Sequence, residues 1–160
     1  MTYEGSGGEV SATFRDRAGI ERLLRTTGAT EFTATGSLTR GEYGLFRWEL
    51  NAKAPGPDPH FHRTFSESFY VLEGTVSLYD GREWIEANAG ELLYVPKGGI
   101  HAFQNASDAP AAMLILFVPG TPRETYFRAS AEIAASGRKM SKEEQTAFLA
   151  SHDQYMVEDG

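Results

Sequence analysis

The sequence predicts an all-β protein, built as a sandwich or barrel of short strands, with two α-helices at its C-terminal end. Short apolar segments alternate with tight turns from about residue 30 to residue 118, which is typical of such folds. The 17 glycines and the 12% aromatic content favour the same class. Beyond Pro119 the apolar spacing becomes helical. A chain of 160 residues suits one domain, so we expect residues 10–160 to form a single domain.

Composition argues against several classes of function. The net charge of −7 and the lack of any basic run argue against nucleic-acid binding. The chain has no cysteine, so a bound metal would be held by nitrogen and oxygen atoms alone. Residues 1–8 lack the features of a signal peptide, and no apolar window approaches the roughly 18 residues that span a bilayer. We therefore expect a cytoplasmic protein that binds no membrane.

The N-terminal part of the chain carries weak signals before the first clear strands. Residues 1–9 are glycine-rich and polar, which predicts a flexible tail. Residues 10–27 fit either a helix or a short strand, because the apolar spacing suits a helix while flanking glycines suit a strand. Strands are expected over Glu31–Leu38 and Tyr43–Leu50, the second with Phe46, Trp48 and Leu50 on one face.

The middle of the chain predicts a rigid loop and then a series of closely spaced strands. The three prolines between residues 55 and 59 cannot donate backbone hydrogen bonds, so this segment is a loop that leads into the histidines. Turns with glycine at positions 74, 81, 90 and 98 separate the strands that follow. The expected strands are Glu67–Leu72, Thr75–Tyr79, Arg82–Glu86, Glu91–Val95, His101–Asn105 and Ala111–Val118.

Two helices are predicted over residues 121–152. Thr121 is expected as the N-cap of the first helix, with Pro122 at its first position and Glu124 completing a capping box. Gly137 should end this helix, and Ser141 should start the second. The apolar residues on these helices need a surface to cover, which is either the barrel or a partner subunit.

Three of the four histidines and one glutamate form the candidate site. His60 and His62 lie two residues apart, so in a strand both imidazoles point the same way. Glu67 can join them if the chain bends between residues 63 and 66, and His101 can reach them from a neighbouring strand. Three imidazoles and a carboxylate suit a divalent ion with open coordination positions. His152, beside Asp153, fits a solvated residue at a helix end better than a ligand.

This stretch resembles the two signature motifs of the cupin superfamily, which read G-x5-H-x-H-x3,4-E-x6-G and G-x5-P-x-G-x2-H-x3-N. The first motif is matched by His60, His62, Glu67 and Gly74, and the second by Gly90, Pro96, Gly98, His101 and Asn105. The departure is Gly56, which lies two residues closer to His60 than the motif asks. The resemblance implies a double-stranded β-helix, or jelly-roll barrel, with His60, His62, Glu67 and His101 as metal ligands. Asn105 is expected to hold a turn.

The resemblance to cupins of the quercetin dioxygenase-like type implies a metal-dependent dioxygenase acting on a small aromatic or enol-type substrate. Iron, manganese, nickel or zinc would accept the ligand set, and Glu67 could also act as a catalytic base. The expected substrate pocket is apolar and is lined by Trp48, Phe69, Val71 and Phe103, while Arg47 and Arg63 are the basic residues nearest the motifs. The alternatives are a non-redox isomerase, lyase or cyclase, and a non-catalytic binding module. A homodimer is expected.

Overall fold

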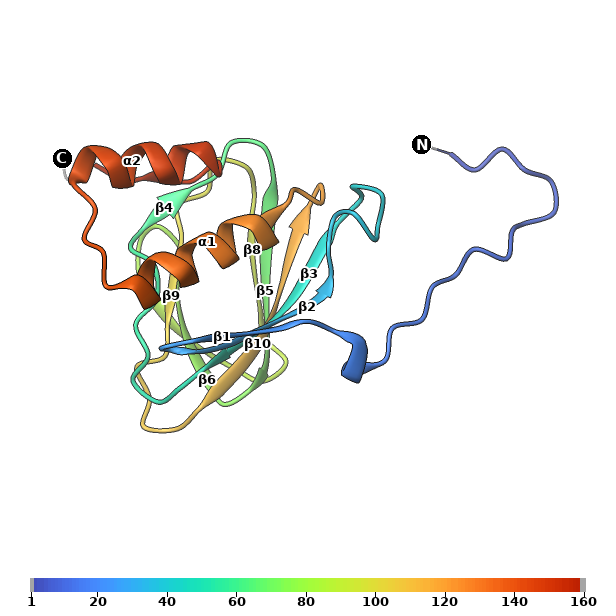
Figure 1. Ribbon diagram of the computed structural model, residues 1–160. Coiled ribbons are helices and arrows are strands. Elements are labelled where there is room, and N and C mark those ends of the chain that lie inside the picture. The colour runs from blue at the N-terminus through green and yellow to red at the C-terminus, as the bar shows by residue number, and fades with distance from the viewer. Residues whose placement is uncertain (1, 159–160) are drawn as a thin grey trace.

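The computed structural model describes residues 2–158 and contains two larger β-sheets with two helices packed along one side (Figure 1). The six-stranded sheet has the order β1 (Arg22–Arg25), β2 (Gly28–Ala34), β3 (Gly44–Leu50), β10 (Ala111–Val118), β5 (Ser66–Glu73) and β8 (Leu92–Val95). The three-stranded sheet has the order β7 (Trp84–Asn88), β6 (Thr75–Tyr79) and β9 (Ala102–Gln104). A two-stranded sheet joins β11 (Tyr155–Met156) to β4 (His60–Phe61).

The two larger sheets form a jelly roll whose strands pair antiparallel. Side chains from both sheets enter one core, which contains Phe46, Phe69 and Met113 from the larger sheet and Leu78 and Phe103 from the smaller one. Hydrogen bonding within residues 2–158 keeps the sheets separate, so the fold is a sandwich of the jelly-roll type rather than a closed barrel. The predicted all-β class with two C-terminal helices is confirmed.

Alternating burial shows why the central strands form as they do. On β3 the buried residues are Gly44, Phe46, Trp48 and Leu50, with half-buried residues between them, as the period of a strand requires. β10 follows the same alternation from Met113 to Phe117 and lies between β3 and β5. The buried side chains of these two strands face the interior of the sandwich.

The N-terminal region resolves the ambiguity that the sequence left. Residues 10–27 include a short 3-10 helix, η1 (Arg17–Gly19), and then strand β1, which forms a hairpin with β2. The six-stranded sheet therefore begins at residue 22, earlier than the predicted start near residue 30. Residues 2–16 form neither strand nor helix and extend away from the sheets (Figure 1).

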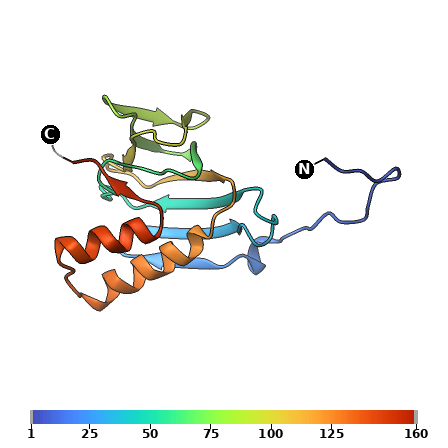
Figure 2. The same ribbon diagram turned by 90° about the horizontal axis from the view of Figure 1, so that it is seen from above.

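The helices α1 (Arg123–Ser136) and α2 (Lys142–Ser151) lie side by side next to the strands (Figure 2). Gly137 ends α1 with a φ of 67°, and Ser141 and Glu144 form a capping box on α2. No helix within residues 2–158 is long and apolar enough to span a membrane.

The predicted capping box on the first helix is wrong. The N-cap of α1 is Pro122, and no side chain caps the helix. The backbone carbonyl of Thr121, rather than its hydroxyl, accepts a hydrogen bond from the backbone N–H of Arg123 at 2.8 Å. The helix therefore starts one residue later than predicted, beyond the reach of the Thr121 hydroxyl. Within the described residues, Thr121 Oγ1 and Glu124 Oε2 are buried without a hydrogen-bond partner.

Candidate metal centre and its cavity

Two backbone segments bring the three histidines together. His60 lies on β4, and His101 lies just before β9; each donates its backbone N–H to the carbonyl of the other, at 3.1 and 3.0 Å. His62 follows β4 on the same side, with its ring centre 5.0 Å from that of His60 and 5.2 Å from that of His101. The expected pair of imidazoles on one strand face is therefore completed by a third from the neighbouring segment.

Glu67 joins the histidines after the bend that the sequence required. Its Oε2 atom lies 2.7 Å from Nε2 of His101 and 3.1 Å from Nε2 of His62. The bend is held by the side chain of Asp153, which accepts hydrogen bonds from the backbone N–H groups of Arg63 and Thr64 and from the Thr64 hydroxyl. A residue from the C-terminal end of the chain therefore fixes the loop that aims Glu67.

Hydrogen bonds at Nδ1 set the orientation of all three imidazoles. Nδ1 of His60 donates to the carbonyl of Asp58 at 2.7 Å, and Nδ1 of His101 to that of Gly99 at 3.0 Å. His62 donates in the same way to the carbonyl of Asp153, at 2.6 Å. A carbonyl can only accept, so Nδ1 carries the proton and Nε2 is left to bind a metal.

The donor set fits a divalent metal ion. One ligand atom from each of His60, His62, Glu67 and His101 can be chosen so that all lie within 4.8 Å of one another, and all four residues are buried. Three imidazole nitrogens and one carboxylate are a donor set that first-row divalent metals accept. These four residues could therefore bind one metal ion, as the sequence motifs implied.

The site holds one fixed negative charge and one neutral imidazole at neutral pH. Burial alone raises the pKa of Glu67, but His101 and His62 outweigh it and hold that pKa well below its usual range. Burial, followed by the charge of His101, lowers the pKa of His60 to about 3. Burial also lowers the pKa of His101, but the charge and hydrogen bond of Glu67 prevail and raise it. A metal would therefore have to compete with a proton at His101 up to a higher pH than at an ordinary histidine.

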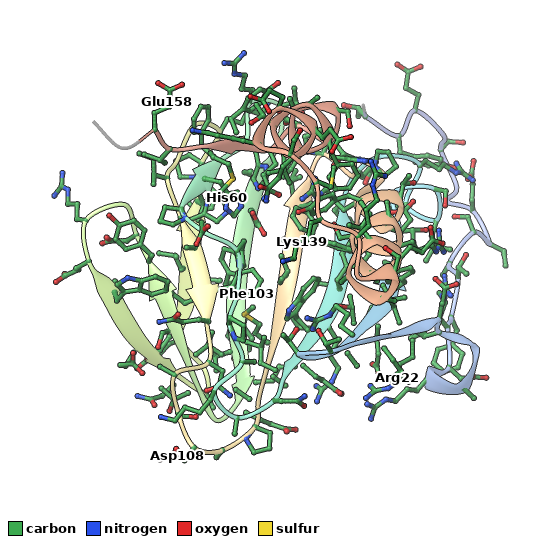
Figure 3. The ribbon with its side chains drawn as sticks, turned by 60° about the vertical axis from the view of Figure 1, so that its left-hand side comes forward. Arg22, His60, Phe103, Asp108, Lys139 and Glu158 are labelled. Atoms are coloured by element: carbon green, nitrogen blue, oxygen red, sulfur yellow. The ribbon has the colours of Figure 1, made fainter. Side chains whose placement is uncertain are left out.

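Three of the four candidate ligands, His60, His62 and Glu67, line a cavity of about 570 Å³. Ile115, Phe117, Trp48 and Phe103 form apolar walls, and Leu24, which is 74% exposed, also lines the cavity. In Figure 3, His60 lies near the end of the sandwich beside α2, and Phe103 lies further along the interior. A small, flat apolar molecule could therefore approach the ligand set through the cavity.

The predicted pocket residues divide into two groups. Trp48 and Phe103 line the cavity. Phe69 and Val71 lie outside its lining and are completely buried in the core. The ring of Phe69 packs 5.7 Å from that of Phe103 and 5.7 Å from that of His101, so it supports these two residues from behind.

Helix α1 and the segment after α2 contribute lining residues that sequence reasoning missed. Arg123 and Gln154 line the cavity together with Tyr126, Phe127, Ser130 and Ala131. The expected basic residues Arg47 and Arg63 do not line it; Arg47 pairs with Glu49, and Arg63 stacks over Tyr155. The spacing of Arg123, Phe127, Ser130 and Ala131 places them on one helical face. That spacing could have predicted the lining of the cavity from sequence. The prediction was missed because an arginine at the start of a helix is ordinarily solvated.

Gly56 and Asn105 have structural roles in the motifs. A Cβ atom on Gly56 would lie 1.7 Å from the carbonyl oxygen of Phe103, so only glycine lets this loop approach β9 so closely. The Asn105 amide donates to the carbonyls of Asn51 and Ala109, and its oxygen accepts from Ser107. The prediction that Asn105 holds a turn is confirmed.

Comparisons with known proteins agree with the motifs. Residues 46–118 match the family model described as the cupin domain. The chain is 33% identical over 111 residues to quercetin 2,3-dioxygenase of Bacillus subtilis (strain 168). That match covers 68% of this chain but only 31% of the relative, so the chain spans about a third of the length of that curated protein.

Solved structures show the same fold at low sequence identity. An RmlC-like cupin from Shewanella frigidimarina NCIMB 400 superposes with a TM-score of 0.59 at 17% identity, covering 72% of this chain and 96% of that one. The polyketide cyclase RemF from Streptomyces resistomycificus gives a TM-score of 0.57 at 18% identity, covering 67% and 79%. With both motifs, the domain match and the jelly roll in agreement, the chain belongs to the cupin superfamily.

Proposed function

We propose that the protein is a metal-dependent enzyme that acts on a small aromatic or enol-type molecule, with dioxygenation as its reaction. One observation carries the proposal: four buried donor residues lie together, and three of them, His60, His62 and Glu67, line a largely apolar cavity. The similarity to the Bacillus quercetin 2,3-dioxygenase supports the choice of a dioxygenase, over about a third of that relative. A small-molecule substrate suits the cavity volume of about 570 Å³.

The metal would be held by His60, His62, Glu67 and His101. When bound there, a divalent ion would polarise a substrate oxygen, and iron, manganese or nickel would also allow redox chemistry. The protein's own contribution would be to hold the metal-binding atoms in position. The carbonyls at Nδ1 do this for the histidines, because they lock each ring with Nε2 facing inward.

The chain's own residues would orient the substrate and accept its proton. Trp48 and Phe103 form an edge-to-face pair, with ring centres 5.8 Å apart, that can hold a flat ring and exclude water. Glu67 is ionised at neutral pH, so it can accept a proton from a substrate hydroxyl. Its two imidazole contacts make it a weak base, and turning away from them towards the substrate would make it a stronger one.

A non-redox isomerase, lyase or cyclase is the second candidate. The contact of 2.7 Å between Glu67 and His101 favours it, because a carboxylate and an imidazole can move a proton without electron transfer. RemF, whose fold this chain shares, is described as a polyketide cyclase. A cupin that binds a metal or small ligand without catalysis is the remaining alternative.

A homodimer is part of the same proposal. The outer face of β5 and β8 exposes Tyr70, Leu92 and Tyr94, with exposed fractions of 42%, 62% and 60%. β8 is also an edge strand of its sheet, which a second copy of this chain could cover. Light scattering on the purified protein tests this, and a single monomeric mass across the micromolar range would contradict it.

Metal analysis followed by turnover assays tests the enzymatic proposal. Protein purified without chelator should contain about one divalent ion per chain, and oxygen uptake should follow addition of a flavonol or a small enol. His101→Ala should abolish uptake, while His152→Ala, outside the ligand set, should retain it. Turnover with zinc in the absence of oxygen would favour the non-redox candidate. No turnover with any divalent metal would refute the catalytic proposal.

A further inference from the structure

Arg123 is a buried cation in the cavity wall that lacks an anionic partner. Its side chain is among the buried charged groups, with 5% of the residue exposed, and it lines the same cavity as His60, His62 and Glu67. Within residues 2–158 it forms no ion pair. Burial lowers its pKa, and the charges of Glu67 and Asp153 oppose that shift without either carboxylate coming within ion-pair distance, so the arginine remains charged at neutral pH. Buried charges are ordinarily paired, so this one indicates a missing anion.

The guanidinium also has a hydrogen-bonding edge that the protein fills only in part. Its Nη1 atom donates to the carbonyl of His152 at 2.7 Å, and Nη2 donates weakly to Gln154 Oε1 at 3.4 Å. Nε is buried and has no hydrogen-bond partner in the described part of the chain. Nε and Nη2 form the edge of an arginine that binds a carboxylate with two parallel hydrogen bonds.

Aromatic rings hold the guanidinium but do not replace an anion. Its central carbon lies 4.5 Å from the ring centre of Tyr126 and 5.1 Å from that of Phe65. Ring faces attract a cation, which offsets part of its burial. The ring faces are poor acceptors for the N–H groups in the guanidinium plane, so the N–H at Nε stays available to a ligand. Phe65 in turn stacks on His62, with ring centres 4.3 Å apart, which places Arg123 next to the metal-ligand set.

A contrast with Arg25 shows that an arginine in this cavity can be satisfied by the protein. Arg25 also lines the cavity, but its three nitrogens donate to two threonine hydroxyls and two backbone carbonyls. Trp48 resembles Arg123 instead, because its buried Nε1 also lacks a hydrogen-bond partner among residues 2–158. Two residues that line the cavity therefore carry a buried, unused donor, one charged and one neutral.

We propose that the natural ligand of the cavity is a flat apolar molecule carrying a carboxylate, and that Arg123 is the residue that selects it. The proposal rests on the proposed function only in taking the cavity as a small-molecule site. Trp48 Nε1 would bind a second acceptor oxygen of the same ligand. A phosphate dianion fits less well, because a single free guanidinium would leave one of its charges unpaired.

Calorimetric titration with 2-naphthoate and its neutral isostere 2-naphthamide tests this inference on metal-replete protein. Wild type should prefer the carboxylate by about 10- to 100-fold, the range expected for charge-assisted hydrogen bonds. Arg123→Gln should remove that preference, whereas Arg123→Lys should retain part of it. Arg82→Gln removes an exposed cation outside the cavity, in the turn between β6 and β7, and should change nothing. Metal content is measured for each variant.

Three results would overturn the inference. One is a wild type that binds the two probes equally or binds neither. Another is an Arg123→Gln variant that keeps the full preference, because the metal alone would then attract the anion. The third is an equal loss of affinity for both probes in the Arg123 variants, which is the signature of a purely structural role. The titration needs no turnover, so a catalytically inactive protein that prefers 2-naphthoate would refute the proposed reaction and leave this inference standing.

Discussion

The two walls of the cavity differ in how completely the protein satisfies their polar groups. On the strand wall, each histidine has its Nδ1 atom bound to a carbonyl, and Glu67 contacts two of the three Nε2 atoms. On the helix wall, Nε of Arg123 has no partner within residues 2–158. Side chains whose hydrogen bonds are all formed suit a permanently bound ion, whereas a donor without a partner suits a ligand that exchanges.

The walls are joined through the C-terminal segment. β11 pairs with β4, which places Met156 opposite His60. The carbonyl of Asp153 holds His62, while the neighbouring His152 carbonyl and Gln154 side chain hold Arg123. Residues 152–156 therefore position both the metal ligands and the proposed anion-binding residue.

The largest expected effect is the loss of the metal when a histidine is removed from the strand wall. His101→Ala deletes one of four ligands and leaves Glu67 with one imidazole contact. Metal affinity should fall by more than the roughly 100-fold that follows loss of a residue that merely orients a ligand. Elemental analysis after purification without chelator measures this. Full metal content in the variant would remove His101 from the ligand set.

Replacing Glu67 with glutamine should have the next largest effect. The variant keeps the size of the side chain but removes the only negative charge in the candidate ligand set. We expect metal affinity to fall by about 100-fold, because a neutral amide oxygen is a much weaker ligand than a carboxylate. Competition with a fluorescent chelator gives the affinity. An unchanged affinity would mean that the histidines alone hold the ion.

The strand wall could be predicted from sequence because its residues are rare and regularly spaced. Three of only four histidines fall in two motifs, and the offset of two residues between His60 and His62 fixes their common face. Arg123 and Asp153 carry no comparable signal. Their roles depend on where α1 and β11 pack against the sheets, which is set by tertiary contacts rather than by local spacing.

The same distinction holds for the fold. Strands with strong alternation, such as β3 and β10, were predicted to within a residue or two. Thr121 and Glu124 have the residue types and spacing of a capping box, yet the helix has Pro122 as its N-cap and begins at Arg123, one residue too late for Thr121 to cap it. Phe69 was placed in the pocket because it shares a strand face with Glu67, but Phe103 packs in front of it. The pattern of one strand predicts which side chains point inward, but not which of them another side chain covers.

Metal affinity should also depend on pH through His101. Its pKa is raised above the ordinary 6.5, because Glu67 outweighs the effect of burial. Below that raised pKa the metal competes with a proton at Nε2, so affinity should fall by about tenfold per pH unit and level off above it. His60, with a pKa of about 3, should contribute nothing in this range. Chelator competition between pH 5.5 and about 9 measures the slope.

Glu67→Gln provides the matched control for the pH dependence. Without the carboxylate, the pKa of His101 should fall, since burial then dominates, and the onset of the metal loss should move to lower pH. An affinity that stays constant in wild type down to pH 5.5, or an onset that is the same in both proteins, would contradict the assignment of this proton to His101.

The smallest effect is expected from Asp153, and it tests whether the two walls are coupled. Asp153 has a φ of 56°, so Asp153→Gly keeps the backbone conformation and the carbonyl that binds His62. It removes the side-chain oxygens that hold the bend before Glu67. Metal affinity should fall by about tenfold, because the bend loosens while all four ligands remain.

Asp80→Gly is the matched control for Asp153→Gly. The Asp80 carboxylate likewise accepts backbone hydrogen bonds, from Arg82 at 2.8 Å and Glu83 at 2.9 Å, but it does so in the turn between β6 and β7. Both variants should lower the melting temperature, since each loses turn hydrogen bonds. Only Asp153→Gly should weaken metal binding. If both variants lost metal affinity equally, the effect would reflect general destabilisation. If neither did, the strand wall would hold its metal without help from the C-terminal segment, and the coupling between the walls would be refuted.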